Sequence, residues 1–262
     1  MTPPQIDASV SLVSLNQRDD LANLLPSLLA AAGRVDFEIL LVDNGPGDGT
    51  SHLVQNVFPQ VHVFQNFNRA GYGENHNLNL RRAGGRYFVV MNSDMTVEPE
   101  VFEELKRFMD EHPDVGIVSP RVLNEDGSIQ GLDKRYPTVL DLFLRRFVPR
   151  RLHRWVQPRL DYYEMRDVGY EAVCDVPFLS GAFMFCRTGL LKALDGFDPR
   201  YFLYFEDVDL CRRVQGTHRT VYYPHVSVTH YWQRAAHSDW RYTYWFFRSA
   251  FTYFRRWGLR LW

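Results

Sequence analysis

The first half of the chain alternates short apolar runs with longer stretches of helical character. Short apolar runs are typical of buried strands, and their alternation with helices predicts right-handed βαβ units. We therefore expect an α/β fold whose largely parallel sheet is covered by helices. The predicted strands are residues 10–15, 37–43, 61–65 and 86–94, and the predicted helices are residues 19–32, 50–57, a segment ending at residue 83 and a segment opened by residues 98–100.

Proline and glycine interrupt this pattern at defined places. Residues 44–49 contain three glycines and a proline, which separate the second strand sharply from the next helix. Pro26 lies inside the first predicted helix, so we expect a kink there or a shifted start. After residue 118 the alternation stops: residues 122–130 predict a hairpin around an Asp-Gly pair, and residues 132–172 show little regular pattern. We find no repeat or linker, which favours one domain with an elaborated second half.

The composition is that of an ordinary soluble globular protein. The chain has 262 residues, 45% apolar content and a net charge of -1, which suits one large α/β domain or at most two small ones. The N-terminus has no basic head followed by an apolar core, so we expect no secretory signal. No apolar run approaches the ~18–20 residues that span a bilayer. Cys174, Cys186 and Cys211 lie too far apart for a disulfide framework or a zinc cluster, and a reducing cytoplasm is expected.

Two basic, aromatic segments break the balanced charge. Residues 234–262 contain six arginines against one acid, Asp239, within a dense set of aromatic residues, and residues 145–159 form a second stretch of this kind. Nucleic acid is one candidate partner, but no recognised nucleic-acid-binding module accompanies these segments. Arginine with Trp and Phe at helical spacing fits the anionic surface of a membrane better. We therefore expect no nucleic-acid partner.

The C-terminal segment predicts a helix that lies on a membrane surface rather than in the core. Arg241, Arg248 and Arg255 recur every seven residues, so they drift only ~20° per step on a helix and form one basic stripe. The alternative is that the aromatic face beside this stripe packs on the domain itself or against a second subunit in a homodimer. That aromatic face consists of Trp240, Tyr244, Phe247, Phe251 and Phe254.

Asp94 directly follows an apolar strand, with Asn92 and Ser93 before it. Open α/β sheets bind ligands at this carboxyl edge. A carboxylate there can hold a hard divalent cation through oxygen, and such cations usually share their coordination shell with substrate phosphates. The other interpretation is a turn aspartate that only caps the next helix.

Five motifs, in order along the chain, carry a family resemblance. Three lie in the first half and resemble the N-terminal half of family 2 glycosyltransferases of the GT-A fold. Residues 179–183 and 195–213, followed by Pro224 and His230, are similar to the acceptor-side signature of that family's rhamnosyltransferase-like branch. The first three motifs are Asp43-Asn44-Gly45 with Asp48-Gly49-Thr50, Gly71-Tyr72-Gly73 with Asn77, and Asn92-Ser93-Asp94.

The resemblance covers residues 8–235 and implies one glycosyltransferase domain over residues 1–262. Within this Rossmann-like GT-A domain, residues 1–118 would form the nucleotide-sugar-binding half and residues 119–235 the acceptor-side half. Residues 236–262 would add the basic aromatic C-terminal helix.

The resemblance implies a nucleotide-sugar site at the sheet edge. Asp43 can accept a hydrogen bond from a uracil or thymine N–H, which suits a dTDP- or UDP-sugar. A divalent cation, Mn²⁺ or Mg²⁺, is implied between Asp94 and the diphosphate, with His230 as the additional ligand; a histidine ligand favours Mn²⁺. His225 and His237 compete for that role. The implied donor-binding residues are Asp43, Asn44, Gly71, Tyr72, Asn77, Asn92, Ser93 and Asp94.

The resemblance also implies an acceptor site with Asp207 as the catalytic base. Glu206 would bind or orient the acceptor hydroxyl, although acids at the start of the predicted helix 207–215 can also serve only as caps. Asp209 is expected to support the helix start or a neighbouring arginine. Arg212 and Arg213 would either reach the phosphates or be solvated. The implied acceptor-binding residues are Gly181, Ala182, Tyr204 and Glu206.

These features together imply an inverting, metal-dependent glycosyltransferase. It would move a sugar, with rhamnose suggested by the branch, to a glycan or lipid-linked acceptor in cell-surface polysaccharide biosynthesis. We expect a cytoplasmic protein that is peripheral at the inner face of the cell membrane. The alternatives are a catalytically silent glycan-binding or scaffold subunit of a synthase complex and a nucleotidyltransferase.

Overall fold

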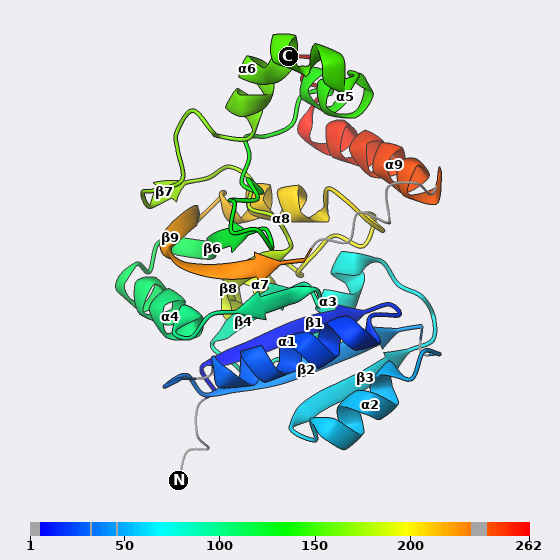
Figure 1. Ribbon diagram of the computed structural model, residues 1–262, viewed down its shortest axis with the longest axis vertical. Helices are drawn as coiled ribbons and strands as arrows, with labels where there is room; N and C mark the ends of the chain where they lie inside the picture. The colour runs from blue at the N-terminus through cyan, green and yellow to red at the C-terminus, as the bar shows by residue number, and fades with distance from the viewer. Residues whose placement is uncertain (1–5, 32, 46, 232–239) are drawn as a thin grey trace.

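A computed structural model describes residues 6–31, 33–45, 47–231 and 240–262. Within this described part, nine strands form one mixed sheet in the order β3-β2-β1-β4-β8-β6-β9-β5, and β7 pairs with β9 (Figure 1). The strands are β1 Ala8–Ser14, β2 Phe37–Asn44, β3 Val61–Asn66, β4 Tyr87–Met91, β5 Met95–Val97, β6 Val115–Leu123, β7 Cys174–Asp175, β8 Phe183–Arg187 and β9 Arg219–His230. The helices are α1 Arg18–Ala30, α2 Thr50–Val57, α3 Tyr72–Arg82, α4 Val101–Glu111, α5 Val139–Phe147, α6 His153–Tyr163, α7 Thr188–Ala193, α8 Glu206–Val214 and α9 Trp240–Trp257, with a 3₁₀ turn at Arg150–Leu152.

The parallel half of the sheet agrees with the sequence prediction. β3, β2, β1 and β4 run parallel, and the register pairs Ser14 with Asp43 and Leu12 with Met91. The carboxyl ends of β1, β2 and β4 therefore meet at one edge. The other half is mixed, because β8 runs antiparallel to both β4 and β6. β4 ends at Met91, so residues 92–94 leave the strand instead of extending it, and the short strand β5 follows.

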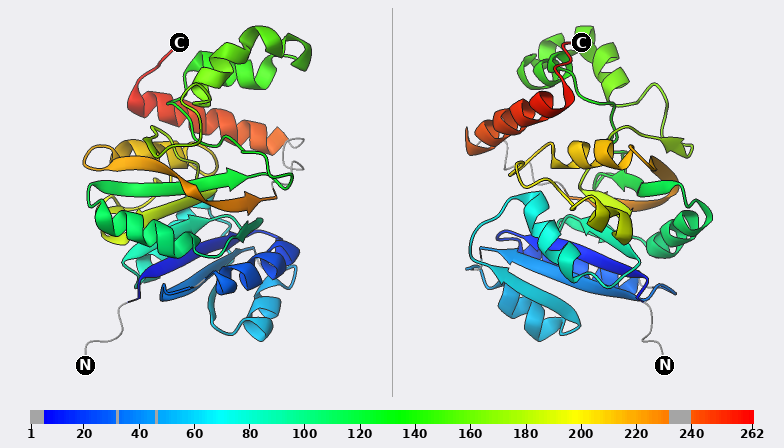
Figure 2. Two further views of the ribbon diagram at one scale, coloured as in Figure 1. Left: turned by 60° about the vertical axis from the view of Figure 1, so that its left-hand side comes forward. Right: turned by 180° about the vertical axis from the view of Figure 1, so that it is seen from behind.

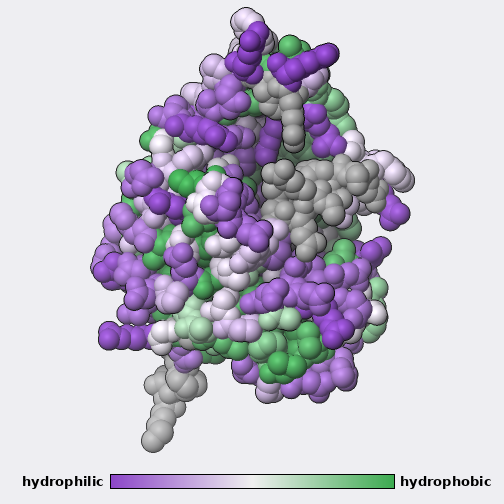
Figure 3. Space-filling model, in the orientation of Figure 1, coloured by the Kyte–Doolittle hydropathy of each residue, from purple (hydrophilic) through white to green (hydrophobic). Residues whose placement is uncertain are grey.

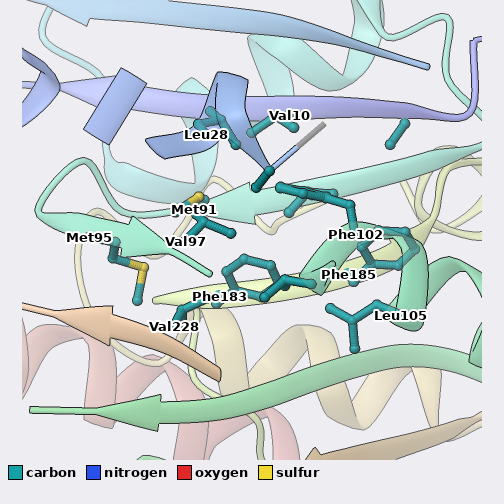
Figure 4. Packing of buried hydrophobic residues seen from close by; sticks show 14 of the residues in the cluster. Val10, Leu28, Met91, Met95, Val97, Phe102, Leu105, Phe183, Phe185 and Val228 are labelled. Carbon is teal, nitrogen blue, oxygen red and sulfur yellow. The ribbon is translucent and has the colours of Figure 1, made fainter. Parts of the chain in front are cut away.

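Both faces of the sheet are buried, which explains why its strands are almost continuously apolar. Val89 and Met91 of β4 belong to the cluster under α1 and α4, and Phe88 and Val90 belong to the cluster on the opposite face. Figure 4 shows the first cluster, in which Phe102 of α4 lies beside Phe185 of β8. Neighbouring residues of one strand thus fill two cores.

Pro26 does not mark the start of the first helix. α1 begins at Arg18 and continues through Pro26, which lies on the exposed face. On that face water can satisfy the carbonyl that the proline leaves without a helical donor. The leucines on the opposite face pack on the sheet.

The predicted absence of regular structure over residues 132–172 is wrong, because the segment contains α5 and α6. Thr138 and Asp141 form a capping box at the start of α5, and the Arg159 guanidinium of α6 lies 2.6 Å from the Asp141 carboxylate. Asp141 is the buried residue of this helix, whereas Phe143 and Phe147 are exposed. The usual helical pattern is therefore inverted, which hides the helix in the sequence. The hairpin prediction is confirmed: Leu123 pairs antiparallel with Ile129.

α9 packs on the domain with one face, so its prediction as a purely surface element is wrong. Tyr253 is buried, and the Ser249 hydroxyl donates to the carbonyl of Leu203 at 2.8 Å. The ring of Phe246 packs at a tilt against that of Phe205, with centroids 5.5 Å apart. Of the predicted aromatic face, Phe254 packs against the buried cluster around Tyr253, and the other four residues are exposed. None of the helices in the described ranges has the length and apolar character needed to span a bilayer.

Asp209 joins α8 to the end of α9. Its buried carboxylate accepts hydrogen bonds from Arg213 at 2.8 Å and from the Trp257 indole at 2.8 Å, and it pairs with Arg256 at 3.1 Å. We expect Asp209→Ala to lower the free energy of unfolding by about 3–5 kcal/mol, because it leaves a buried guanidinium without its partner. Urea denaturation measures this loss. Asp167→Ala, which removes an exposed carboxylate, serves as the control and should change stability far less.

Candidate active site

Asp43 presents an unused acceptor at the sheet edge. The Ser51 hydroxyl donates to its Oδ2 at 2.5 Å, while the buried Oδ1 has no partner among the described residues. A hollow of about 410 Å³ lies beside the loop that follows β1 and is lined in part by Asp48. Burying a carboxylate oxygen without a donor is costly. The N–H of a pyrimidine base is the kind of donor that would satisfy it.

Asn44 and Gly71 shape the loop between β3 and α3. Asn44 exchanges two hydrogen bonds with the backbone of Ala70, at 3.0 and 3.1 Å. A Cβ on Gly71 would lie 2.5 Å from the Phe202 carbonyl oxygen, so only glycine fits. The Tyr72 N–H donates to that same carbonyl at 2.9 Å. These residues therefore join the loop to the segment before Glu206.

Asn77, a predicted donor residue, uses its side chain in hydrogen bonds to the backbone of Phe197. Its amide donates to the Phe197 carbonyl at 2.7 Å and accepts from the Phe197 N–H at 2.8 Å. Both polar ends of the side chain are thus committed to the turn that contains Gly196. We leave Asn77 out of the donor site.

Asp94 and His230 lie side by side because β5 pairs with β9. The backbone N–H of Tyr231 donates to the Asp94 carbonyl at 2.8 Å, and His230 Nε2 lies 3.2 Å from Asp94 Oδ1. The Asn92 amide lies 3.3 Å from the same nitrogen. Two segments more than a hundred residues apart therefore converge on one point.

Gln130, which the sequence did not single out, sets the tautomer of His230. Its amide nitrogen donates to the His230 carbonyl at 3.1 Å and to Asn124 at 2.9 Å, which leaves its oxygen as an acceptor. That oxygen lies 2.7 Å from His230 Nδ1, so Nδ1 carries the hydrogen. In the neutral ring the lone pair of Nε2 then points toward the Asp94 carboxylate. Only the hairpin around residue 126 hinted that residue 130 would reach this place.

A divalent cation fits this arrangement. A carboxylate and an imidazole lone pair repel each other at 3.2 Å unless a cation or proton lies between them. His230 is buried, and Asp94 is partly exposed. The described residues contain no cluster of three or more His, Cys, Asp or Glu suited to a metal. Other ligands would therefore come from substrate phosphates, as is usual for Mg²⁺. His225 is exposed and packs edge-on against Tyr223, and His237 lies outside the described residues.

Tyr72 connects the Asp94 side of the site to Asp207. Its hydroxyl lies 2.9 Å from Asn92 Oδ1 and 2.7 Å from the Gly181 carbonyl. The Gly181 N–H donates to Asp207 at 3.1 Å. Burial raises the pKa of Tyr72 well above its usual value, and the carboxylates of Glu206, Asp207 and Asp94 raise it further. Three acidic groups thus converge on one phenol.

Glu206 and Asp207 are adjacent acids in unlike surroundings. Glu206 is 5% exposed, and its Oε2 has no hydrogen-bond partner among the described residues. Its pKa is raised well above the usual value by burial and by the charge of Asp207. Burial also raises the pKa of Asp207, but the N–H groups of Gly181 and Val208 and the Lys134 ammonium oppose this. The surroundings therefore favour the charged form at Asp207, which accepts two N–H donors, over Glu206, which accepts none at Oε2.

The backbone before this pair is strained. Tyr204 and Phe205 have φ values of 69° and 67°, which non-glycine residues rarely adopt. Such strain persists where surrounding contacts enforce it and is common at functional sites. Here the ring of Phe246 packs 5.9 Å from that of Tyr204. Ala182, the remaining predicted acceptor residue, accepts the Asn92 N–H at 3.0 Å.

Neither Arg212 nor Arg213 is available for phosphates. The Arg212 guanidinium lies 4.1 Å from the ring centre of Tyr136 and also faces Trp257. Arg213 pairs with Asp209 at 2.8 Å, as expected for Asp209, and donates to two backbone carbonyls. Both arginines hold α8 in place.

The sequence matches the family model for glycosyl transferase family 2 over residues 9–192. The chain belongs to glycosyl transferase family 2. As a member of this family it is a glycosyltransferase, as the motifs implied.

One relative of this family 2 glycosyltransferase is the N-acetylglucosaminyl-diphospho-decaprenol L-rhamnosyltransferase of Mycobacterium tuberculosis (strain H37Rv). The two are 29% identical over 252 residues, which cover 88% of this chain and 77% of the relative. The rhamnosyltransferase WbbL of Escherichia coli K12 is 36% identical over 87 residues, 31% of each protein. The likeness to rhamnosyltransferases thus extends over most of the chain.

Solved structures confirm the GT-A fold of this family 2 glycosyltransferase. Staphylococcus aureus TarS 1-349 in complex with UDP-GlcNAc has a TM-score of 0.62 at 19% identity and covers 89% of this chain. The mannosyltransferase PcManGT from Pyrobaculum calidifontis, with GDP-Man and Mn²⁺, has a TM-score of 0.66 at 18% identity and covers 95%. The chain spans 61% and 64% of the lengths of those two structures.

Proposed function

We propose that this glycosyltransferase is inverting and metal-dependent. It moves a sugar, rhamnose by likeness to its relatives, from a dTDP- or UDP-sugar to a glycan or lipid-linked acceptor in cell-surface polysaccharide biosynthesis. The observation that carries this proposal is the convergence of two pairs at one sheet edge. Asp94 and His230 form one pair, Glu206 and Asp207 form the other, and Tyr72 lies between them.

The donor is proposed to bind along the carboxyl ends of β2 and β4. The free oxygen of Asp43 accepts from the base. The Ser93 hydroxyl, which follows the carboxyl end of β4, is buried and has no partner among the described residues. Asp94 and His230 hold the cation, which when bound offsets the negative charge of the departing diphosphate. Residues 1–118 supply this half of the site, apart from His230.

The acceptor is proposed to bind against residues 181–182 and 204–207. Asp207, held ionised by two N–H groups, takes the proton of the acceptor hydroxyl as that oxygen attacks the sugar. Glu206 keeps its proton and can donate a hydrogen bond to the acceptor. Because a protonated acid is a poor nucleophile, the pair supplies one base and no second nucleophile. A single displacement inverts the anomeric configuration.

A donor panel tests the proposal. The protein is incubated with dTDP-rhamnose, UDP-glucose, UDP-galactose and UDP-N-acetylglucosamine, each with Mn²⁺ and with chelator, and release of nucleoside diphosphate is measured. We expect release from one donor class, strongest for dTDP-rhamnose, and only with metal. Failure to release diphosphate from any donor, with a lipid-linked acceptor present, would favour the silent scaffold subunit.

Gln130 offers a test of the cation site that does not depend on turnover. We expect Gln130→Ala to weaken Mn²⁺ binding about 10–100-fold in the presence of UDP, because His230 loses the acceptor that fixes its ring. Titration of Mn²⁺ by its electron paramagnetic resonance signal measures this affinity. Gln130→Glu keeps an acceptor for Nδ1–H and should bind Mn²⁺ nearly as well as the natural protein. Equal losses in both variants would contradict the proposed tautomer.

A further inference from the structure

Two helices far apart in the sequence join into one exposed aromatic surface. Phe143 and Phe147 of α5, with Tyr244, Phe247 and Phe251 of α9, are each between 49% and 69% exposed. We call these five residues the α5–α9 ridge. Ring centroids 5.5 Å apart connect Phe143 to Phe147, and centroids 6.3 Å apart connect Phe147 to Phe247. Figures 1 and 2 show both helices at the end of the molecule opposite the N-terminus.

The last residues of the chain extend the ridge. The N–H groups of Val139 and Leu140 donate to the carbonyls of Arg260 and Leu261, at 2.9 and 3.1 Å. The C-terminal segment therefore runs beside the first turn of α5, and Trp262 is exposed there. Soluble monomers rarely expose large contiguous apolar patches unless the patch is a contact surface.

Arginines surround the ridge, and acids are almost absent. Arg145, Arg146, Arg248 and Arg255 are exposed on the same two helices. Residues 139–157 and 240–262 together contain one acidic residue, Asp141. That residue is buried and paired with Arg159, so it does not offset the surface charge. Figure 3 shows hydrophilic and hydrophobic side chains interleaved over this end of the molecule.

The positive charge around the ridge distinguishes between its possible binding partners. In a two-fold contact the same patch meets itself, so a second copy would place arginines against arginines, which is unfavourable. Bases of a nucleic acid can stack on exposed phenylalanines, but a nucleic acid offers no hydrocarbon for Leu259 and Leu261 at the chain end. An anionic bilayer offers both phosphates and hydrocarbon, since aromatic side chains enter the headgroup boundary while arginines meet the phosphates.

The inner face of α9 contacts the segment that precedes the acidic pair. The rings of Trp245 and Phe202 stack with centroids 4.2 Å apart, and Ser249 bonds to the Leu203 carbonyl. Phe246 lies against Tyr204. One helix, about 10 Å across, therefore separates the ridge from residues 201–205. A surface bound to the ridge would therefore lie one helix away from the segment that leads into Glu206 and Asp207.

We propose that the α5–α9 ridge docks this protein on the surface of an anionic bilayer and thereby holds Asp207 one helix away from the headgroups. Docking itself does not require sugar transfer. Presentation of a lipid-linked acceptor to Asp207 rests on the proposed function. The test therefore measures vesicle binding without donor, and transfer separately.

The full chain is sedimented with vesicles of phosphatidylcholine containing phosphatidylglycerol, and with vesicles of phosphatidylcholine alone, at low and high salt. We expect binding to the anionic vesicles that weakens with salt. Arg248→Gln with Arg255→Gln should reduce the partition about 10–30-fold, at about fivefold for each arginine. Phe147→Ser, Phe247→Ser and Phe251→Ser together should reduce it at least about tenfold.

Matched controls place the same changes elsewhere. Arg34→Gln with Arg107→Gln removes two exposed arginines, one in the loop after α1 and one on α4. Phe67→Ser removes an exposed phenylalanine from the loop after β3. Vesicle binding by these controls should equal that of the natural protein. Equal weakening by controls and ridge variants would overturn the proposal. So would a stable dimer that fails to bind anionic vesicles at low salt and dissociates when the three phenylalanines are replaced. Transfer failing while docking persists would count against the proposed function alone.

Discussion

Replacing Asp94 by alanine is expected to abolish metal-dependent turnover, with a loss of at least about 100-fold. The carboxylate lies 3.2 Å from His230 Nε2, in the turn between β4 and β5 at the carboxyl edge of the sheet. Without it, two diphosphate charges would face the sheet edge with one neutral imidazole to fix a cation. Release of nucleoside diphosphate measures turnover. Titration of Mn²⁺ in the presence of UDP should show a parallel loss of metal affinity.

The controls separate charge from position. Asp114→Ala removes an exposed carboxylate just before β6 that pairs with Arg219 of β9. This variant should leave diphosphate release and Mn²⁺ affinity unchanged. Natural protein that retained its activity in excess chelator would sink the cation proposal, whatever Asp94→Ala did. If Asp94→Ala bound Mn²⁺ normally, the ligand set would have to exclude Asp94.

The sequence was sufficient for the parallel half of the fold because its strands are buried on both faces. Val89 and Phe88 fill different cores, so β4 is apolar without interruption and could be found directly. The turn at residues 92–94 then had to lie at the carboxyl edge. The prediction that His230 lies beside Asp94 depended on the family motif. Nothing in the local sequence of β9 distinguishes His230 from His225 as a metal ligand.

α5 was missed for a physical reason. A helix is recognised when its apolar side faces the core, but in α5 the buried residue is Asp141 and exposed residues include Phe143 and Phe147. A similar ambiguity affected α9, which is aromatic on both faces. Periodicity cannot tell whether Phe246 or Phe247 faces inward. The choice is made by contacts with Tyr204 and Phe205, which lie about 40 residues earlier in the chain.

The remaining gaps concern long-range hydrogen bonds. Gln130 reaches His230 across 100 residues, and Asn77 reaches Phe197 across 120. Both are amides in ordinary surroundings in the sequence. Their hydrogen-bond partners depend on which loop the fold brings opposite them. The sequence therefore offered no reason to select Gln130, and the family motif assigned Asn77 to the donor site.

Replacing Asp207 by asparagine is expected to lower transfer by ~10²–10⁴-fold, the usual contribution of a positioned base. Asparagine can keep a bond to the Gly181 N–H through its oxygen, so the loop should stay in place. It cannot take a proton from the acceptor. Donor and Mn²⁺ binding, which involve the opposite end of the site, should remain near their natural values.

The pH dependence of transfer gives a second, independent test of Asp207 as the base. Burial raises the pKa values of Glu206 and Asp207, so the reactive charge is lost as pH falls through a value above that of an ordinary carboxyl group. Transfer by the natural protein should therefore decline on the acidic side earlier than an unperturbed aspartate would allow. The residual transfer of Asp207→Asn should lack this decline.

Glu206→Gln tests which of the two acids is the catalytic base. If Glu206 keeps its proton, glutamine mimics it closely, and transfer should fall far less than in Asp207→Asn. The pKa of Glu206 is higher in the folded than in the unfolded protein, so Glu206 destabilises the fold at pH values above its unfolded-state pKa. Glutamine removes this effect, and Glu206→Gln should therefore maintain or raise the free energy of unfolding at neutral pH. A larger loss of transfer in Glu206→Gln than in Asp207→Asn, with both variants folded, would reverse the two roles and make Glu206 the base.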